Sequence, residues 1–253
     1  MLVKNNEWFG QPKNHCANCP SARYCLAHGL SDGEVAQFSR KIKHPGPLHK
    51  GEKLFMMGDS FNSFAMVHSG CVKSYVTSRG GEHQIIGFYM PGDILGLDGI
   101  ASGEHRYTAE ALETTSICEL AFRDYEDLCN CAPSLQWRLL DALSQKMVAE
   151  QKMLLMLGKM TSEQRLANFL LDLSSCMAAR GMSAQTISLP MSRSDIANYL
   201  GLVIETVSRL FSRFQVEGVL TVQRRIIGIS DRTRLQAIAY NNCEDYCELD
   251  RVA

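Results

Sequence analysis

Three cysteines lie close together near the start of this 253-residue chain, as Cys16, Cys19 and Cys25. Their spacing, C-x2-C-x5-C, lets a turned backbone direct the three sulfurs toward one point. Thiolates grouped in this way bind zinc or an iron–sulfur cluster, and both need four ligands. The three cysteines therefore predict a metal centre whose fourth ligand comes from elsewhere. The candidates are the other cysteines of the chain, at positions 71, 118, 129, 131, 176, 243 and 247.

A second group of residues, in the last quarter of the chain, has the pattern of a nucleic-acid reader. The sequence Ser192-Arg193-Ser194-Asp195 resembles a capping box and predicts a short helix over 195–200 that stops at Gly201. A second helix is predicted over 205–217, followed by a basic hairpin over 219–229. Two short helices around a glycine turn, followed by such a hairpin, are typical of a winged helix-turn-helix domain.

The second of these helices has one apolar face and one polar face. Glu205, Ser208 and Arg209 share the outward face. Glutamate accepts a hydrogen bond from cytosine N4, and arginine binds guanine O6 and N7 through two bonds. The alternative is an ordinary helical pair with a solvated charged face, but the cap, the turn, the polarity of both faces and the wing agree. We therefore predict DNA contacts from Glu205, Ser208, Arg209, Ser192, Arg193, Thr206 and Arg213.

The segment between these two groups contains the elements that must position them. From 48 to 122, glycines recur at intervals of about ten residues and separate short apolar or alternating runs such as 63–67 and 83–89. This pattern predicts many short antiparallel strands, in a small barrel or jelly roll. Farther along the chain, a helix is predicted over 163–180, with Gly181 as its C-cap.

One long helix is predicted over 133–160, because no glycine or proline interrupts the chain between Pro133 and Gly158. Its narrow apolar stripe fits a coiled-coil dimer seam, made by Leu139, Leu143, Met147, Glu150, Leu154 and Leu157. Glu150 would then face its own copy and weaken the dimer, so that a weak signal could shift the balance between monomer and dimer. The alternative, a solvated Glu150 at the rim of the seam, stays open.

Composition and charge narrow the class of protein. Apolar residues make up 45% of the chain, which is enough for the cores of two modest domains. The net charge is −1, but residues 161–235 carry nine Lys and Arg against six Asp and Glu, and residues 236–253 carry one against four. The first residues lack the apolar run of an export signal, and no stretch approaches the ~18 apolar residues of a membrane span. We therefore expect a cytoplasmic protein that binds no membrane, with cysteines serving as ligands or apolar side chains rather than disulfides.

These parts, in this order, resemble the Crp/Fnr transcription regulators over nearly the whole chain. The similarity to the Fnr oxygen-sensing branch is carried by Cys16, Cys19 and Cys25, by residues 111–119 (ALETTSICE) and by residues 204–209 (IETVSR). The fold expected is α+β. Its parts would be a cluster-binding segment at 1–30, a jelly-roll-like sensor domain at 31–132, a dimerisation helix at 133–160, a winged helix-turn-helix domain at 161–235 and an acidic tail at 236–253.

The resemblance implies a function and a ligand set. Cys16, Cys19, Cys25 and Cys118 would hold an oxygen-labile [4Fe-4S] cluster that promotes dimerisation. Glu205, Ser208 and Arg209 would read a TTGAT-like half-site of a palindrome in double-stranded promoter DNA. The protein would be an activator or repressor that contacts RNA polymerase, and not an enzyme.

Several cysteines and histidines are not part of the predicted set of four ligands. Cys243 and Cys247 form a C-x3-C pair in the acidic tail and have no assigned role. We expect Cys71, Cys129, Cys131 and Cys176 to be buried as small apolar side chains. His15 and His28 flank the thiols and are expected to be solvated rather than ligating.

Three alternative functions stay open. A cyclic-nucleotide sensor would use Arg106 to bind phosphate. The Gly-Glu-Leu sequence typical of such a pocket is replaced here by Gly96-Leu97-Asp98, and this function would leave the N-terminal cysteines unexplained. A structural zinc site would use the same ligands, and spacing does not separate zinc from iron–sulfur. An iron–sulfur redox protein would leave the helix-turn-helix unexplained, and the chain lacks a dinucleotide glycine motif.

Overall fold

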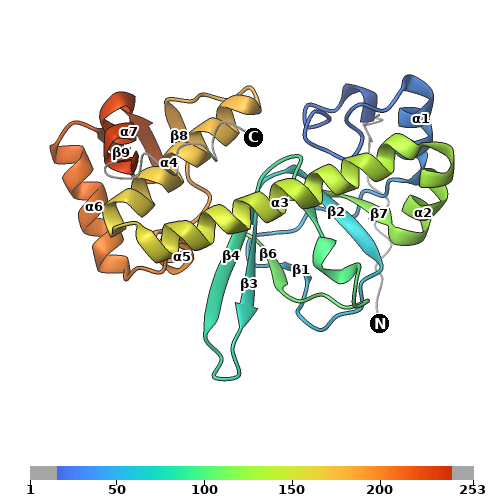
Figure 1. Cartoon of the computed structure of the whole chain (residues 1–253), viewed down its shortest axis with the longest axis horizontal. Helices are drawn as coiled ribbons and strands as arrows, with labels where there is room; N and C mark the ends of the chain where they lie inside the picture. Colours follow the sequence, from blue (N-terminus) through green and yellow to red (C-terminus); the bar gives the residue numbers. More distant parts are fainter. Residues whose placement is uncertain (1–15, 241–253) are drawn as a thin grey trace.

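The computed structural model describes residues 16–240. A β-roll and a C-terminal domain lie at the two ends of one long helix, α3 (Pro133–Lys159), which crosses the whole molecule (Figure 1). The predicted long helix is thus confirmed to within one residue at its end. Within residues 16–240, no helix has both the length and the hydropathy needed to span a bilayer.

The roll consists of two small sheets whose strand pairs are all antiparallel, as predicted. One sheet has the order β1-β6-β3-β4 and the other the order β5-β2-β7. The strands are β1 (Lys53–Phe55), β2 (Ser63–Ser69), β3 (Val72–Thr77), β4 (His83–Tyr89), β5 (Ile94–Leu95), β6 (Thr108–Ala111) and β7 (Ser116–Ala121). Glycine is required where the chain turns from β2 to β3, because Gly70 has φ +88° and a Cβ there would lie 2.6 Å from the Thr114 carbonyl oxygen.

Two helices that the sequence patterns did not reveal cover one side of the roll. They are α1 (Asp32–Lys41) and α2 (Phe122–Cys131). Phe38 of α1 and Leu128 of α2 are buried in one cluster with Leu120 of β7 and with Leu135 and Leu139 of α3. The short 3-10 helix η1 (Cys16–Asn18) contacts α1. The N-terminal cysteine segment therefore packs on the same core as the first turns of α3.

The C-terminal domain contains the predicted winged helix-turn-helix. Its elements are α4 (Ser162–Ala179), β8 (Thr186–Ser188), α5 (Arg193–Leu200), α6 (Ile204–Val216), β9 (Leu220–Gln223), β10 (Ile226–Ile229) and α7 (Arg232–Tyr240). The Ser192 hydroxyl accepts the Asp195 amide at 3.0 Å, and Gly201 ends α5 with φ +63°, so the predicted cap and turn are confirmed.

The predicted start of the acidic tail at residue 236 is wrong. Helix α7 continues to Tyr240, and Ala239 is fully buried against α4 and its neighbours. The short apolar run Leu235 to Ala239 forms part of the domain core, which a boundary drawn from charge alone could not show. The cysteines of the predicted tail, Cys243 and Cys247, lie outside the described residues, as does His15.

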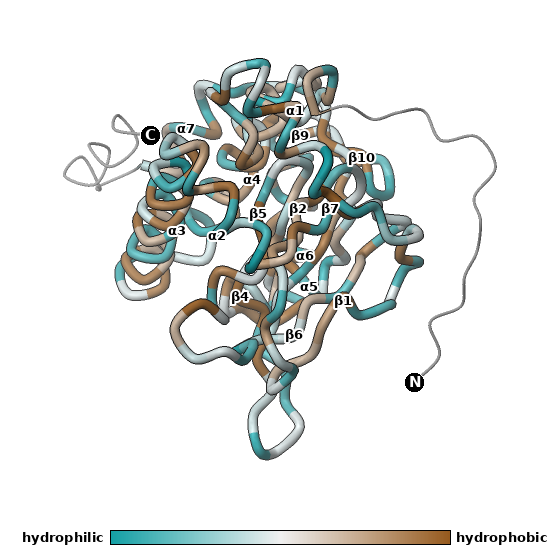
Figure 2. Tube along the Cα trace, turned by 90° about the vertical axis from the view of Figure 1, so that its right-hand side faces the viewer, coloured by the Kyte–Doolittle hydropathy of each residue, from teal (hydrophilic) through white to brown (hydrophobic). Residues whose placement is uncertain are grey.

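The two domains share apolar contacts. Cys71, Met90 and Leu112 of the roll are buried in one cluster with the core of the C-terminal domain and with Met156 of α3. Figure 2 shows hydrophobic residues recurring along α3 and α4, as helices with buried faces require. Helix α3 thus contributes its first turns to the core beside the roll and its last turns to the C-terminal domain.

Candidate metal centre and nucleic-acid interface

The four predicted cysteine ligands come from two parts of the fold. Cys16 begins η1, and Cys19 and Cys25 lie in the turns that follow, where the Cys19 amide donates to the Cys16 carbonyl at 3.2 Å. Cys118 lies on β7, the last strand of the roll, and pairs in register with Met66 of β2. Cys16, Cys25 and Cys118 all pack against the apolar cluster between the roll, α1 and α3.

The four thiols lie near enough to influence one another electrostatically. Burial, with smaller contributions from the charges of Cys25, Cys16 and Cys19, raises the pKa of Cys118 to about 12. Burial likewise raises the pKa of Cys25 to about 11, with smaller contributions from Cys16 and Cys19. Unneutralised thiolates are therefore costly here, and a cationic centre shared by the four sulfurs would offset that cost.

Two histidines beside the thiols were not identified from the sequence. The His68 side chain, from β2, forms a hydrogen bond with Cys19 that lowers the pKa of that thiol. The His44 Nδ1 atom lies 3.6 Å from the Cys118 sulfur. Both histidines are far from the cysteine motif in sequence, so only the paired strands bring them to it. His28, by contrast, is exposed, in agreement with the expectation for it.

Four thiols are the kind of donors that zinc and iron–sulfur clusters take, and the donor types alone do not separate the two. Among the side chains of residues 16–240, no group of three or more His, Cys, Asp or Glu is close enough to hold a metal ion. Cys16, Cys19, Cys25 and Cys118 would be the residues that hold such a group.

The remaining described cysteines differ in exposure. Cys71 and Cys129 are buried, as expected, and Cys176 is half-buried against the C-terminal core. The prediction for Cys131 is wrong, because this residue is exposed at the end of α2. The apolar face of α2 carries Tyr125, Leu128 and Cys129, and Cys131 falls outside it.

The recognition face of the helix-turn-helix is open to solvent. Glu205, Ser208 and Arg209 are exposed on α6, while Val207, Leu210, Phe211 and Phe214 are buried beneath it. Thr206 is half-buried. Ile204, the first residue of α6, was not among the predicted contacts and is 43% exposed beside Glu205. An exposed aliphatic side chain at this position suits contact with a thymine methyl group.

Two arginines among the predicted DNA contacts, Arg193 and Arg213, already have partners within the protein. The guanidinium of Arg193 lies 3.2 Å from the ring centre of Phe211, and its Nη1 is buried without a hydrogen-bond partner. Burial also lowers the pKa of Arg193 to about 10. Arg213 is exposed, but its guanidinium is paired with Glu163 and with Glu217, so a contact with DNA would have to compete with these carboxylates. The wing turn presents exposed Arg224 and Arg225.

The predicted dimer seam is wrong at its first position, whereas Met147, Glu150 and Leu154 of the same prediction are exposed. Leu139 is buried in the core beside the roll, and Leu143 packs against the same cluster. Apart from Val148, the large apolar residues of α3 that face solvent form a line that shares Met147 and Leu154 with the predicted seam and is called here the exposed stripe: Trp137, Leu140, Met147 and Leu154. These residues are three or seven positions apart, which is the spacing of a coiled-coil seam.

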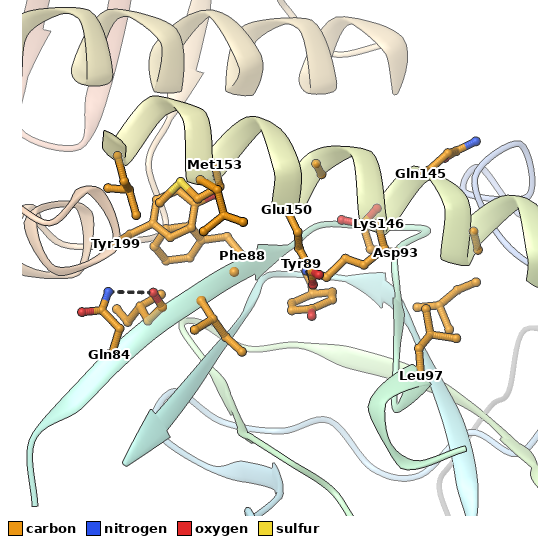
Figure 3. Close-up of a pocket in the computed structure, with 18 of the residues that line it drawn as sticks. Gln84, Phe88, Tyr89, Asp93, Leu97, Gln145, Lys146, Glu150, Met153 and Tyr199 are labelled. Atoms are coloured by element: carbon orange, nitrogen blue, oxygen red, sulfur yellow. Dashed lines mark hydrogen bonds and ion pairs between the residues drawn. The ribbon is translucent and has the colours of Figure 1, made fainter. Parts of the chain in front are cut away.

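Glu150 lies at the edge of the exposed stripe. Its side chain is 65% exposed and its carboxylate lies 3.8 Å from the Lys146 ammonium group. A groove of about 790 Å³ runs between α3, β4 and α5 beside it. Figure 3 shows Lys146 and Glu150 above Tyr89, with Phe88, Met153 and Tyr199 at the other end of the groove.

The phosphate-binding features of a cyclic-nucleotide pocket are altered in this roll. The Asp98 carboxylate accepts the Arg106 backbone amide at 2.5 Å, and a carboxylate repels a phosphate group rather than donating to it. The Arg106 side chain is exposed and bonds to Ser102. Inside the roll, the His105 ring stacks on Phe55 with centroids 3.6 Å apart.

Comparisons with known proteins agree with the description of both the β-roll and the helix-turn-helix domain. The model of a Crp-like helix-turn-helix domain matches residues 164–238, and that of a cyclic nucleotide-binding domain matches residues 46–130. The Anaerobic regulatory protein of Haemophilus influenzae is 41% identical over 90% of this chain and 89% of its own length. The Fumarate and nitrate reduction regulatory protein of Escherichia coli is 39% identical over 89% of this chain and 90% of its own. The structure of FixK2 from Bradyrhizobium japonicum superposes with a TM-score of 0.71 at 30% identity, covering 78% of this chain and 96% of FixK2.

Proposed function

Since this chain belongs to the Crp/Fnr family of DNA-binding transcription regulators, we propose that it is the oxygen-responsive kind, with a [4Fe-4S] cluster as its sensor. The observation that carries the proposal is that Cys118, on β7 of the roll, packs against the same apolar cluster as Cys16 and Cys25 of the N-terminal segment. No enzymatic activity is proposed. The protein would act in the cytoplasm, where promoter DNA and RNA polymerase are its partners.

The thiols would link the N-terminal segment to the roll and to α3. When bound, the cluster would be ligated by all four thiolates and would supply an oxygen-labile connection between them. Leu26 and Ala27, directly after Cys25, are buried in the same apolar cluster as Leu135 and Leu139 of α3. The Ser134 hydroxyl on α3 also donates to Glu34 of α1 at 3.3 Å. Ligation by Cys16, Cys19 and Cys25 would therefore order the segment that supports the start of α3.

A supported α3 would present the exposed stripe to a second copy of the chain. Two parallel α3 helices would bury Trp137, Leu140, Met147 and Leu154 from each copy against one another. The dimer would place its two α6 helices in successive major grooves of a palindrome. Oxygen would shift the population back to monomers by removing the constraint on the N-terminal segment.

Metal analysis of protein purified without oxygen tests this function. We expect about four iron and four sulfide per chain and a visible absorption band that bleaches in air, with loss of the dimer. Stoichiometric zinc, unchanged by air, would support the structural-zinc alternative and contradict oxygen sensing. Metal-free protein that dimerises on addition of a cyclic nucleotide would contradict it as well.

The reading helix gives a prediction about sequence specificity. Substituting Arg209→Ala removes a bidentate contact to guanine, which contributes ~1–3 kcal/mol of discrimination. We expect binding to the TTGAT-like site to weaken about 5- to 150-fold, with a smaller change on unrelated DNA. Fluorescence anisotropy at fixed salt measures both affinities. Gln215→Ala, also exposed on α6, is the control, and an equal loss on both DNAs would show that Arg209 binds phosphate only.

Glu150 gives a prediction about the set point of the switch. We propose that its carboxylate repels the partner copy, so Glu150→Ala should strengthen dimerisation about two- to fivefold and allow some DNA binding in air. Sedimentation equilibrium and DNA binding with and without oxygen measure the effect. Asp141→Ala, which removes a carboxylate of α3 outside the exposed stripe, should change neither. Unchanged oxygen sensitivity of Glu150→Ala would favour the solvated-rim alternative.

A further inference from the structure

Tyr24, which lies between two of the predicted ligands, reaches across to the C-terminal domain. Its hydroxyl donates to the carbonyl of Ala179 at the end of α4, 155 residues away in sequence. Its ring lies 4.9 Å from the guanidinium carbon of Arg180. Figure 1 shows the N-terminal loops and the end of α4 on the same side of α3. The cysteine loop therefore contacts the domain that carries the reading helix.

The Arg180 side chain, which contacts the Tyr24 ring, is fixed by hydrogen bonds to the roll. It is only 10% exposed. The Nε atom donates to the Pro91 carbonyl at 2.7 Å, and Nη2 lies 2.6 Å from the Asp93 carboxylate. Arg180 thus joins the end of α4 to the turn between β4 and β5 of the roll, and Tyr24 covers this joint.

The roll turn is shaped to admit Tyr24. Gly92 has φ +99°, and a Cβ at this position would lie 2.5 Å from the Cβ of Tyr24. Beside it, the Gly92 amide donates to the Val67 carbonyl at 2.7 Å, so the turn is fixed to the roll. Three segments meet at this point: the cysteine loop, the roll turn and the end of α4. We call this meeting point the Tyr24 junction, formed by Tyr24, Gly92, Asp93, Ala179 and Arg180.

We propose that the Tyr24 junction couples the thiol site to the DNA-binding domain of the same protomer, a route that does not pass through dimerisation. This inference rests on the proposed function, because it takes ligand binding by Cys19 and Cys25 as the signal. When both sulfurs are fixed, the loop between them has fewer conformations. The contact of Tyr24 with Ala179 then costs less conformational entropy. The loop would then hold the C-terminal domain in the orientation seen here. Without that restriction, the Tyr24 contact would form less often and the end of α4 would open more readily.

Hydrogen exchange at the end of α4 tests the coupling. The amides of Arg180, Gly181 and Met182 donate to carbonyls in the last turn of α4, so their exchange reports its opening. The full chain is measured with its cluster and after air treatment. To exclude dimerisation, the same measurement is made on a chain carrying Leu154→Glu, which is expected to be monomeric. We expect these amides to exchange about three- to tenfold more slowly with the cluster than without it, in both chains. An effect of this size corresponds to the Tyr24–Ala179 hydrogen bond and the Tyr24–Arg180 cation–π contact together.

Variants on both sides of the contact assign the effect. Tyr24→Ala should abolish the cluster-dependent slowing, whereas Arg23→Ala, an exposed neighbour in the same loop, should keep it. If Tyr24→Ala does not load a cluster, Arg180→Gln tests the contact from the side of α4 and should reduce the slowing, because it removes the cation–π contact but keeps the Ala179 carbonyl. Iron and sulfide content is measured in each sample. Loaded wild-type protein that bleaches in air but shows no slowing, or a slowing of full size in loaded Tyr24→Ala or in Arg180→Gln, would overturn the coupling and leave the proposed function intact. Wild-type protein that never loads a cluster would contradict the proposed function itself.

Discussion

Cys118→Ser is expected to prevent cluster loading and to abolish oxygen-dependent DNA binding. Loss of a partner outside the direct ligand shell costs about 10- to 100-fold in metal affinity, and loss of a ligand should cost more. The serine hydroxyl is also a poorer ligand for iron than a thiolate. Because the dimer population depends on the filled site, anaerobic affinity for the palindrome should fall by about 100-fold or more. Iron analysis and DNA binding without oxygen measure both effects.

Cys131→Ser is the matched control for this substitution. Cys131 is exposed at the end of α2 and lies outside the four-thiol group, so the same chemical change should leave iron content and DNA binding unaltered. Circular dichroism checks that both variants are folded. Full iron content in Cys118→Ser would show that Cys118 is not a ligand and that the fourth ligand lies elsewhere. His44 and His68 would then be the first residues to substitute, because they lie beside the thiols.

Leu154→Glu should convert the protein to a monomer whether or not the cluster is present. The Leu154 side chain is 72% exposed in the single chain, and a dimer along the exposed stripe would bury it twice. Burial of each leucine contributes ~1.5–3 kcal/mol, and the two new carboxylates would repel each other. The dissociation constant of the dimer should therefore rise by at least about 100-fold. Sedimentation velocity of anaerobic protein at several concentrations measures this shift.

Met57→Glu provides the corresponding control for a new surface charge. Met57 is 49% exposed in the loop between β1 and β2, away from α3, so its substitution should leave the dimer intact. Leu154→Glu should still load iron, since the thiol site lies at the other end of α3. An anaerobic dimer of normal stability in Leu154→Glu would show that another surface joins the two copies. Leu139→Glu is not a usable probe of the seam, because Leu139 is buried in the core beside the roll.

The sequence alone determined the elements whose signals are local. The Ser192 cap, the glycine after α5 and the apolar face of α6 each act within a few residues, so their positions were predicted to within about two residues. Glycines at regular intervals likewise predicted the short strands of the roll. Helices α1 and α2 were missed because few of their side chains are apolar and buried, although Ser31 and Glu34 form a capping box that marks the start of α1.

Only the tertiary structure decided which surfaces meet. Helix α3 has two apolar faces, and periodicity could not tell which one the roll covers: Leu139 and Leu143 pack on it, whereas Met147 and Leu154 face solvent. The approach of Cys118 to the N-terminal thiols depends on strand pairing between β7 and β2. The contact of Tyr24 with α4 joins residues 155 positions apart. Local sequence sets the shape and polarity of each element, but its partners depend on how the whole chain excludes water from its apolar faces.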